Sequence, residues 1–160
     1  MTKTIEESID VQVPVQTAYN QWTQFEEFPR FMEGVEEVRQ MDDTRLYWVA
    51  EVAGQRREWE AKITEQEPDQ RIAWTAAGDV VHAGVVSFHR LDDATTRVML
   101  QMELEPESWV DKAADALGIT TSRIRGDLER FKEFIESRGQ ETGSWRGEVE
   151  PPGQVTQTDQ

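Results

Sequence analysis

The two histidines, His82 and His89, are the side chains best suited to acid–base or metal chemistry near neutral pH. They are an odd number of positions apart, and successive side chains of a strand point to opposite faces, so one regular strand would place them on opposite sides of a sheet. Only a bulge near Gly84 would change this. No third metal ligand accompanies them. We therefore predict no metal site and expect surface or edge positions rather than a general base.

Paired carboxylates could also act as a general acid and base, and Glu58 and Glu60 form such a pair. They alternate with Trp59 and Ala61, which assigns them to the solvated face of a strand and not to a catalytic site. Arg57 is two positions before Trp59, so its side chain would point to the same face of the strand as Trp59. Its guanidinium could donate to a ligand carbonyl or carboxylate inside a cavity, although its closeness to a turn favours a position at the rim.

Motifs for other chemistry are missing from the sequence. There is no phosphate-binding glycine loop, no GxGxxG element and no nucleophile elbow, and Ser87 and Ser108 belong to no recognisable triad. The absence of cysteine excludes disulfides and thiolate chemistry. We therefore predict no catalytic residue and no cofactor.

The charge balance limits the possible partners. The 160 residues include 17 basic and 32 acidic ones, for a net charge of −15, which opposes nucleic-acid binding and contact with anionic membranes. The segment Met1–Val13 has no secretory apolar core, and no run approaches the roughly 18 apolar residues of a membrane span. We expect an acidic, soluble, cytoplasmic protein without stable membrane insertion. The sequence does not indicate an oligomeric state.

Alternating apolar and polar residues predict a series of about six consecutive antiparallel strands after Gly34. The alternation is clearest in the last strand, where Val98, Leu100 and Met102 share one face. Turns with Gly, Pro or Asp separate the segments. The predicted strands are 35–41, 45–53, 56–67, 71–76, 80–91 and 96–105.

A long helix is predicted at Thr120–Gly139, because Ile124, Leu128, Phe131 and Ile135 form one apolar stripe. Burying each of these side chains contributes roughly 1.5–3 kcal/mol, an upper estimate. A helix of this length is marginal alone, so the stripe requires a sheet as its partner. A helical lead-in is expected over 108–117, with a break at Gly118.

Shorter sequence patterns predict the structure at the two ends of the chain. A first strand covers 9–13, a short helix Val15–Thr23, and a second helical turn Phe25–Met32. Residues 140–160 are almost free of apolar side chains and contain several Gly and Pro, which predicts a disordered tail. We therefore expect one domain over 1–139, followed by this tail.

A meander of this kind can curl into a half-barrel and leave an apolar cavity under the helix. Core filling competes with cavity lining for each inward residue, and Phe28, Phe31 and Met32 could flank an entrance. Aromatic faces suit a planar ligand. The candidate ligand-binding residues are Trp48, Trp59, Trp74, Phe88, Leu100, Met102, Ile124, Leu128, Phe131 and Arg57.

The sequence also resembles a known family. The likeness lies in Ile9–Gln40 (IDVQVPVQTAYNQWTQFEEFPRFMEGVEEVRQ), in the aromatic and glycine positions of Gly54–Pro68 (GQRREWEAKITEQEP) and Ile72–Trp74 (IAW), in His82–Leu91 (HAGVVSFHRL), and in the closing helix. These features resemble the polyketide cyclase/dehydrase and coenzyme Q-binding proteins of the START/Bet v 1-like (SRPBCC) superfamily. The resemblance implies an α+β helix-grip fold, with a curved antiparallel sheet of about seven strands around the C-terminal helix. It also implies a cavity for a lipid, isoprenoid quinone, sterol or polyketide-like molecule.

Three functional hypotheses follow. The first is a non-catalytic protein that binds or carries a small hydrophobic ligand between the sheet and the C-terminal helix. The second is an enzyme of the cyclase or dehydratase type, which would need a polar side chain such as Arg57 or His82 in the cavity. The third is an interaction or stress protein with a closed pocket.

Overall fold

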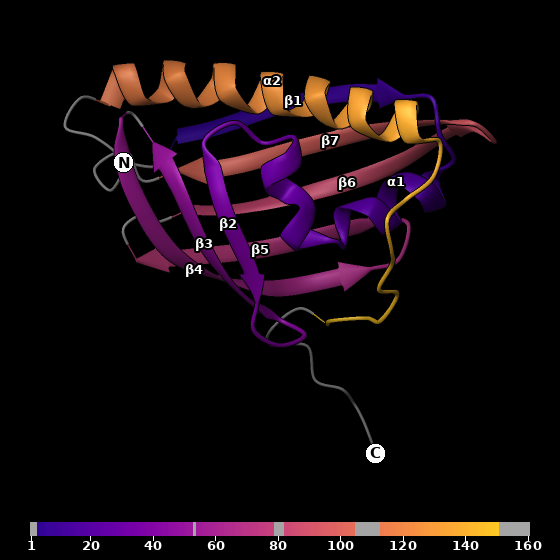
Figure 1. The fold of residues 1–160 in the computed structure, drawn as a ribbon, viewed down its shortest axis with the longest axis horizontal. Helices are drawn as coiled ribbons and strands as arrows, with labels where there is room; N and C mark the ends of the chain where they lie inside the picture. Colours follow the sequence, from indigo (N-terminus) through magenta and orange to yellow (C-terminus); the bar gives the residue numbers. More distant parts are fainter. Residues whose placement is uncertain (1–2, 53, 79–81, 105–112, 151–160) are drawn as a thin grey trace.

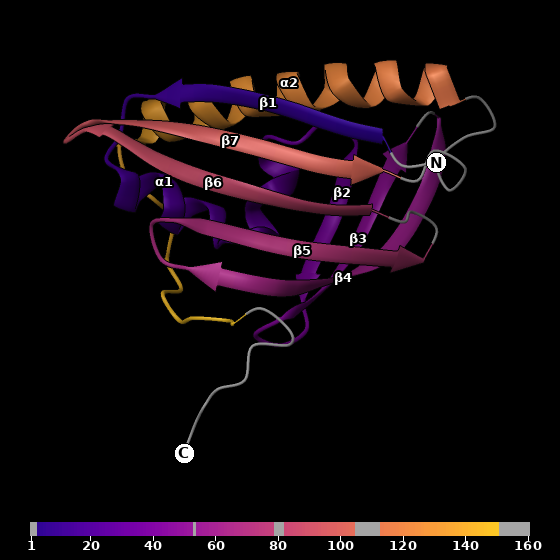
Figure 2. The same cartoon turned by 180° about the vertical axis from the view of Figure 1, so that it is seen from behind.

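The sheet is a meander closed by its first strand. The computed structural model describes residues 3–52, 54–78, 82–104 and 113–150. Its seven antiparallel strands lie in the order β1-β7-β6-β5-β4-β3-β2 (Figures 1 and 2), so that β1 pairs with the last strand and every other neighbour is a sequence neighbour. The strands are β1 (Lys3–Val11), β2 (Val35–Gln40), β3 (Arg45–Val52), β4 (Gln55–Glu67), β5 (Arg71–Gly78), β6 (His82–Asp92) and β7 (Thr95–Leu104).

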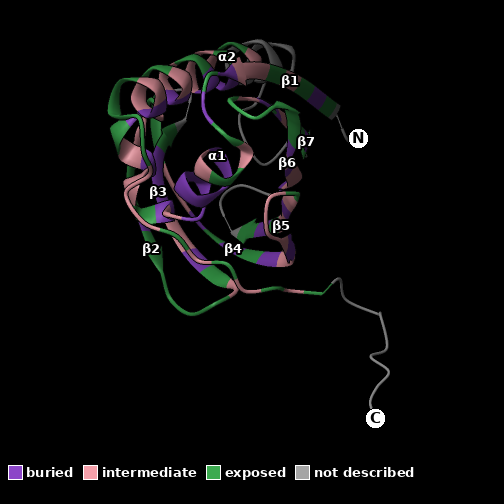
Figure 3. Cartoon of the chain, turned by 90° about the vertical axis from the view of Figure 1, so that its right-hand side faces the viewer, coloured by how far each residue is buried: buried purple, intermediate pink, exposed green. Residues whose placement is uncertain are grey.

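Three helices accompany the sheet. Two short helices connect β1 to β2, namely the α-helix α1 (Val15–Trp22) and the 3-10 helix η1 (Phe25–Arg30). The long helix α2 (Ala113–Arg138) follows β7. Seen end-on, the sheet curls around α1, and α2 lies across the open side between β1 and β3 (Figure 3). This is the predicted helix-grip α+β fold.

Period-two alternation accounts for the concave core. In β7, Val98, Leu100 and Met102 are buried, whereas Arg97, Gln101 and Glu103 on the opposite face are exposed and Met99 is half-buried. The inward face is therefore the one that the sequence marks as apolar, because strand side chains alternate between the two faces.

The helix α2 buries its stripe as predicted. Ile124 and Leu128 are 7% and 2% exposed, and Phe131 and Ile135 are fully buried. The expected break at Gly118 is wrong, since α2 runs continuously from Ala113. Glycine in a helix interior costs only about 1 kcal/mol relative to alanine, which a long packed helix tolerates.

The C-terminal segment 140–150 differs from the predicted disordered tail. It leaves α2, passes α1 and reaches β4 (gold in Figure 1). Val149 forms an antiparallel bridge with Gln66, with N–O distances of 2.8 and 3.0 Å. Thr142 exchanges two hydrogen bonds with the Gln21 side chain, of 2.8 and 3.0 Å. The prediction of disorder is therefore wrong for residues 140–150. The hydrogen-bond partners of this segment are the backbone of Gln66 and the side-chain amide of Gln21, both buried and both far away in the sequence.

Residues 151–160 lie outside the described part of the chain, and a domain boundary at Gly139 stays a prediction. Gly139 itself adopts φ 76°, and its N–H donates to the Ile135 carbonyl (2.9 Å), as expected of a glycine that ends a helix.

A candidate ligand-binding cavity

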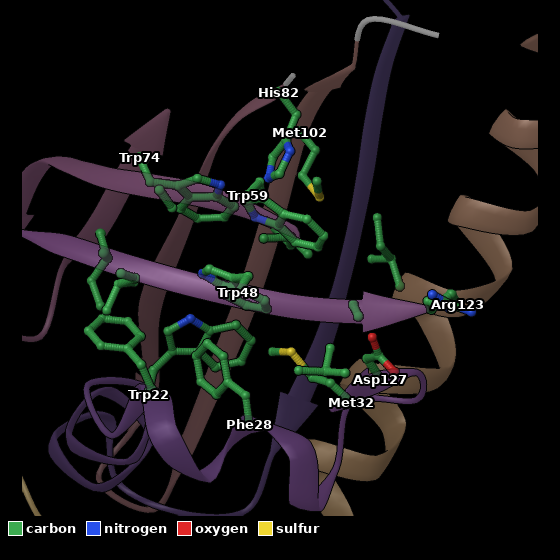
Figure 4. Close-up of a pocket in the computed structure, with 18 of the residues that line it drawn as sticks. Trp22, Phe28, Met32, Trp48, Trp59, Trp74, His82, Met102, Arg123 and Asp127 are labelled. Carbon is green, nitrogen blue, oxygen red and sulfur yellow. The ribbon is translucent and has the colours of Figure 1, made fainter. Parts of the chain in front are cut away.

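An apolar cavity of about 140 Å³ lies between the concave face of the sheet, η1 and α2 (Figure 4). An engineered protein cavity of about 150 Å³ accommodates benzene. The cavity thus has room for roughly one aromatic ring. Its walls include the side chains of Trp22, Phe25, Phe28, Met32, Val35, Leu46, Trp48, Ala50, Trp59, Ala61, Ile63, Ile72, Trp74, His82, Leu100, Met102, Arg123, Ile124, Asp127 and Leu128.

Register places two tryptophans against each other on one wall. Trp48 of β3 is directly opposite Trp59 of β4, and their rings stack with centroids 5.6 Å apart and planes 14° apart. Phe28 of η1 contacts Trp48 from another side, at 5.6 Å between centroids. The three rings give this wall an aromatic surface, and the flat faces of the two indoles suit a planar ligand.

Trp74 lines the cavity because its neighbour on β6 has no side chain. Trp74 pairs with Gly84, and a Cβ at position 84 would lie 2.6 Å from Trp74 Cζ2. The pairing of β6 with both neighbours is regular at Gly84, with its irregularity only between Arg90 and Asp92. The sequence-based possibility of a bulge at Gly84 is therefore not realised.

Regular pairing separates the two histidines. His82 lines the cavity at 9% exposure, with its ring edge-on to Trp59 and Trp74 at 5.9 and 6.5 Å. His89 is exposed on the other face, and its Nε2 lies 2.9 Å from Ser87 Oγ. The predicted opposite orientation is confirmed, but the surface position predicted for His82 is wrong.

Burial changes the acid–base behaviour of His82. Desolvation disfavours the imidazolium and lowers the pKa of His82 from 6.5 to about 4. The ring is therefore neutral at pH 7, which lets one nitrogen accept and the other donate a hydrogen bond.

The helix side of the cavity carries two charged groups, both engaged by neighbouring backbone. Arg123 donates to the Glu51 carbonyl, and Asp127 Oδ1 accepts the Glu33 N–H at 2.8 Å. Arg130, one turn along α2, bonds Asp127 and the Phe31 carbonyl (2.9 Å). Burial raises the pKa of Asp127. These contacts attach α2 to β3 through Glu51, and to the connection between η1 and β2 through Phe31 and Glu33.

Seven of the predicted ligand-binding residues line the cavity together, namely Trp48, Trp59, Trp74, Leu100, Met102, Ile124 and Leu128. Phe88 and Phe131 do not. Phe88 packs against Tyr19 and Trp22, and Phe131 against Trp22 and Phe31.

Arg57 is also absent from the cavity wall. It is half-buried on β4 opposite Ala50, which is consistent with the rim position favoured by its closeness to the turn.

Several residues that line the cavity were not among the predicted ligand-binding residues. Trp22 and Phe25 come from the connecting helices, and His82, Arg123 and Asp127 supply the ionisable groups. The position of Asp127, three residues after Ile124, was a usable signal, because residues three apart on a helix share a face. Of the predicted entrance residues, Phe28 and Met32 line the cavity, whereas Phe31 is buried against Phe131.

Between residues 3 and 150, apart from the undescribed gaps, no group of three or more His, Asp or Glu side chains could hold a metal ion. Within the same residues, no helix is both long and apolar enough to cross a lipid bilayer.

A curled antiparallel sheet that grips a C-terminal helix over an apolar cavity defines the START/Bet v 1-like class of proteins. The family model described as "Polyketide cyclase / dehydrase and lipid transport" matches residues 11–135. The chain therefore belongs to this family.

One protein sequence and two solved structures illustrate the similarity in sequence and in fold. The chain is 60% identical over 146 residues to an uncharacterized 17.2 kDa protein in the melC2-rnhH intergenic region of Streptomyces lincolnensis, covering 91% of this chain and 97% of that protein. The fold of the present chain is similar to that of the Zhui aromatase/cyclase from Streptomyces sp. R1128, with a TM-score of 0.75 at 16% identity. The similarity covers 91% of the present chain and 100% of the Zhui chain. A START superfamily protein from Mycobacterium smegmatis has a TM-score of 0.67 at 14% identity, covering 84% and 95%.

Proposed function

We propose that this protein binds a small hydrophobic ligand in the cavity between the sheet and α2. The observation that carries this proposal is the cavity's lining, in which, among the described residues, aromatic and aliphatic side chains surround three ionisable ones, His82, Arg123 and Asp127. Enclosed apolar surface with a few polar groups is typical of small-molecule sites. The family description, which includes lipid transport, supports the same role.

The volume of the cavity limits the size of the ligand that it can enclose. A volume of about 140 Å³ encloses one ring or a comparable hydrocarbon portion, so a sterol or long isoprenoid would need the walls to move or would extend beyond them. The proposed ligand is therefore small, or only its head group is enclosed. It would be carried without chemical change.

Filling the cavity tests the proposal. Ala61 is buried on the cavity wall, whereas Ala77 on the neighbouring strand is exposed. Ala61→Leu should weaken binding of indane, an uncharged bicyclic hydrocarbon, by at least about tenfold, because the added side chain occupies the ligand's space. Ala77→Leu adds the same atoms outside the cavity and should leave the Kd within about twofold.

Isothermal titration of indane into the three proteins gives the Kd values. Native mass spectrometry of protein purified from its own host gives a second measurement, with an added apolar mass expected. Equal binding by wild type and Ala61→Leu would place the ligand elsewhere. A clean apo mass together with no indane binding would overturn the proposal.

A cyclase or dehydratase-type enzyme is the second candidate. It is favoured by His82, a neutral imidazole in the cavity wall, and by the aromatase/cyclase among the similar folds. Under this hypothesis the protein converts a linear β-polyketone to a cyclised product, and His82→Gln binds the substrate without converting it. Chromatography of the products distinguishes the two functions. The third hypothesis, a closed pocket, loses support because side chains leave a cavity of about 140 Å³ unfilled.

A further inference from the structure

The C-terminal segment 140–150, here called the strap, bonds to a group of buried polar residues. Each of them is at most 3% exposed, and they are Asn20, Gln21, Thr23 and Gln66. Asn20 donates to Glu141 at 2.9 Å, and Thr23 Oγ1 accepts the Trp145 N–H at 3.1 Å. Gln21 and Gln66 bond the strap as described with the fold. Buried polar groups are costly without hydrogen-bond partners, so the strap stabilises this part of the molecule.

The same helical segment also supplies one wall of the cavity. Three of the strap's partners, Asn20, Gln21 and Thr23, are sequence neighbours of Trp22, and the gold strap passes α1 in Figure 1. Trp22, labelled in Figure 4, lines the cavity together with Phe25 of η1. The strap and the cavity therefore share the α1–η1 segment.

Helix α1 depends on tertiary contacts for its position. It has eight residues, and Pro14 at its N-cap makes no side-chain capping hydrogen bond. A helix of this length is not stable alone in water. Tyr19 and Trp22 pack on Phe88 of β6, with ring centroids 5.4 and 6.3 Å apart. The position of this cavity wall therefore follows from these ring contacts and from the strap.

The strap is attached in a way that permits its release. Each of its residues is half-buried or exposed, and the two classes alternate from Gly143 to Glu150. Elements with few buried apolar contacts open locally at a lower free energy than the whole fold. Helix α2 ends at Arg138, before the strap begins. The strap can therefore detach without unwinding that helix.

We propose that the strap sets the size of the ligand that the cavity admits. With the strap bound, the α1–η1 wall stays in place and the cavity keeps its volume of about 140 Å³, enough for roughly one ring. When the strap detaches, this wall moves outward and a larger apolar ligand enters. The coupling is reciprocal, so a larger ligand also favours the detached strap. This inference rests on the proposed function and adds the element that regulates ligand size.

Weakening the strap's hydrogen bonds tests the proposal in the full chain. The released variant combines Thr142→Val, Arg146→Ala and Val149→Pro, each of which removes a group that bonds the residues beneath the strap. The probes are indane and N-phenyl-1-naphthylamine, an uncharged amine with three aromatic rings. The released variant should bind N-phenyl-1-naphthylamine at least about fivefold more tightly than the wild type, and indane within about twofold.

The matched control changes three exposed residues of the same strap, Gln140→Ala, Ser144→Ala and Glu150→Ala. This variant should keep both Kd values within about twofold of the wild type, because the hydrogen bonds to the buried residues remain. Fluorescence titration gives the Kd of N-phenyl-1-naphthylamine, and isothermal titration gives that of indane.

A disulfide across the strap provides a second test within one protein. Gln66 and Val149 exchange both backbone hydrogen bonds, a pairing that brings Cα atoms to about 5.5 Å and so within disulfide range. The chain has no cysteine, so Gln66→Cys with Val149→Cys forms a single disulfide. The oxidised protein should bind N-phenyl-1-naphthylamine at least about fivefold more weakly than the same protein reduced with dithiothreitol, and indane about equally.

The outcomes separate this inference from the proposed function. If indane binds but neither strap release nor the disulfide changes N-phenyl-1-naphthylamine binding, the inference is wrong and the proposed function stands. An equal gain in the control variant would also overturn the inference. The redox comparison decides the question if the released variant does not fold. If neither probe binds any of these proteins, the proposed function itself fails.

Discussion

At the scale of single residues, Gly84 determines where Trp74 can lie. Alanine at position 84 would bring its Cβ to 2.6 Å from Trp74 Cζ2 and 3.0 Å from the Gln101 carbonyl. Gly84→Ala should lower the free energy of unfolding by about 1–3 kcal/mol, the usual cost of overpacking. It should also displace Trp74 toward the cavity and weaken indane binding. Urea unfolding and titration measure the two effects.

Gly126 provides the matched control. It lies within α2, where a Cβ would meet only the guanidinium of Arg130, at 3.1 Å from Nη1, and this side chain needs to shift by only a few tenths of an ångström. Gly126→Ala should therefore stabilise the protein by up to about 1 kcal/mol through higher helix propensity. If both substitutions change stability equally, close packing at Gly84 is not the cause.

His82 should make stability depend on pH. Burial depresses its pKa from 6.5 to about 4, so between these values the unfolded chain binds a proton that the native state does not. Stability is fully retained above pH 6.5 and falls as the pH drops toward 4. At pH 5 the loss due to His82 should be about 2 kcal/mol relative to pH 7.

His82→Gln isolates this contribution, because glutamine is polar and does not titrate. Urea unfolding at pH 7 and pH 5 should give a smaller decrease for the variant than for the wild type. Carboxylates such as Asp42, whose pKa is lowered to about 2 by Arg45, titrate at lower pH and are common to both proteins. Parallel decreases in the two proteins would contradict the buried position of His82.

At the scale of elements, the C-terminal segment 140–150 acts as a strap on α1. Arg146 donates to Asn20 Oδ1 (2.6 Å) and Asp69 Oδ2 (2.8 Å), and its guanidinium lies 5.6 Å from the Tyr19 ring centroid. Tyr19 OH in turn accepts a hydrogen bond from Gln66 (3.0 Å). The strap thus provides polar partners for side chains that α1 buries.

Arg146→Ala should destabilise the protein by about 1 kcal/mol, since it removes two charge-assisted hydrogen bonds that remain partly solvated. Arg90→Ala is the control. Arg90 forms an ion pair with Asp93, which is 91% exposed, and its loss should cost no more than about 0.5 kcal/mol. Thermal unfolding of both variants measures the difference. Equal effects would mean that the strap contributes no more than a surface ion pair.

At the scale of the whole molecule, the net charge of −15 should oppose the compact state. Ion pairs such as Arg45–Asp42 and Arg97–Asp10 are largely exposed, so each contributes little stability for salt to remove. Raising sodium chloride from 0.01 to 0.5 M should therefore increase the Tm by a few degrees, because screening weakens the self-repulsion.

Potassium chloride is the control for this salt effect, since screening depends on ionic strength and not on the cation. Differential scanning calorimetry at matched ionic strengths gives both series. A Tm that falls with either salt would show that favourable ion pairs outweigh the net repulsion.

The alternation of Trp48, Trp59, Leu100 and Met102, and the helical stripe at Ile124, were sufficient to predict a curved antiparallel sheet packed on a C-terminal helix and seven of the residues that line the cavity. The reason is that alternation and helical periodicity are local properties of the chain. Helix α1 is the counterexample, because its polar side chains Asn20 and Gln21 are buried at 3% and 0% exposure. Their partners Glu141 and Thr142 are 121 residues away, and no periodic signal connects them.

The sequence by itself determined which side chains face the concave side of the sheet, since that depends only on parity along each strand. The tertiary structure alone decided that His82 is buried, that Phe88 and Phe131 fill the core, and that a cavity of about 140 Å³ remains. A cavity is the small difference between two large volumes, the space enclosed by the backbone and the space filled by side chains. Packing in three dimensions sets that difference.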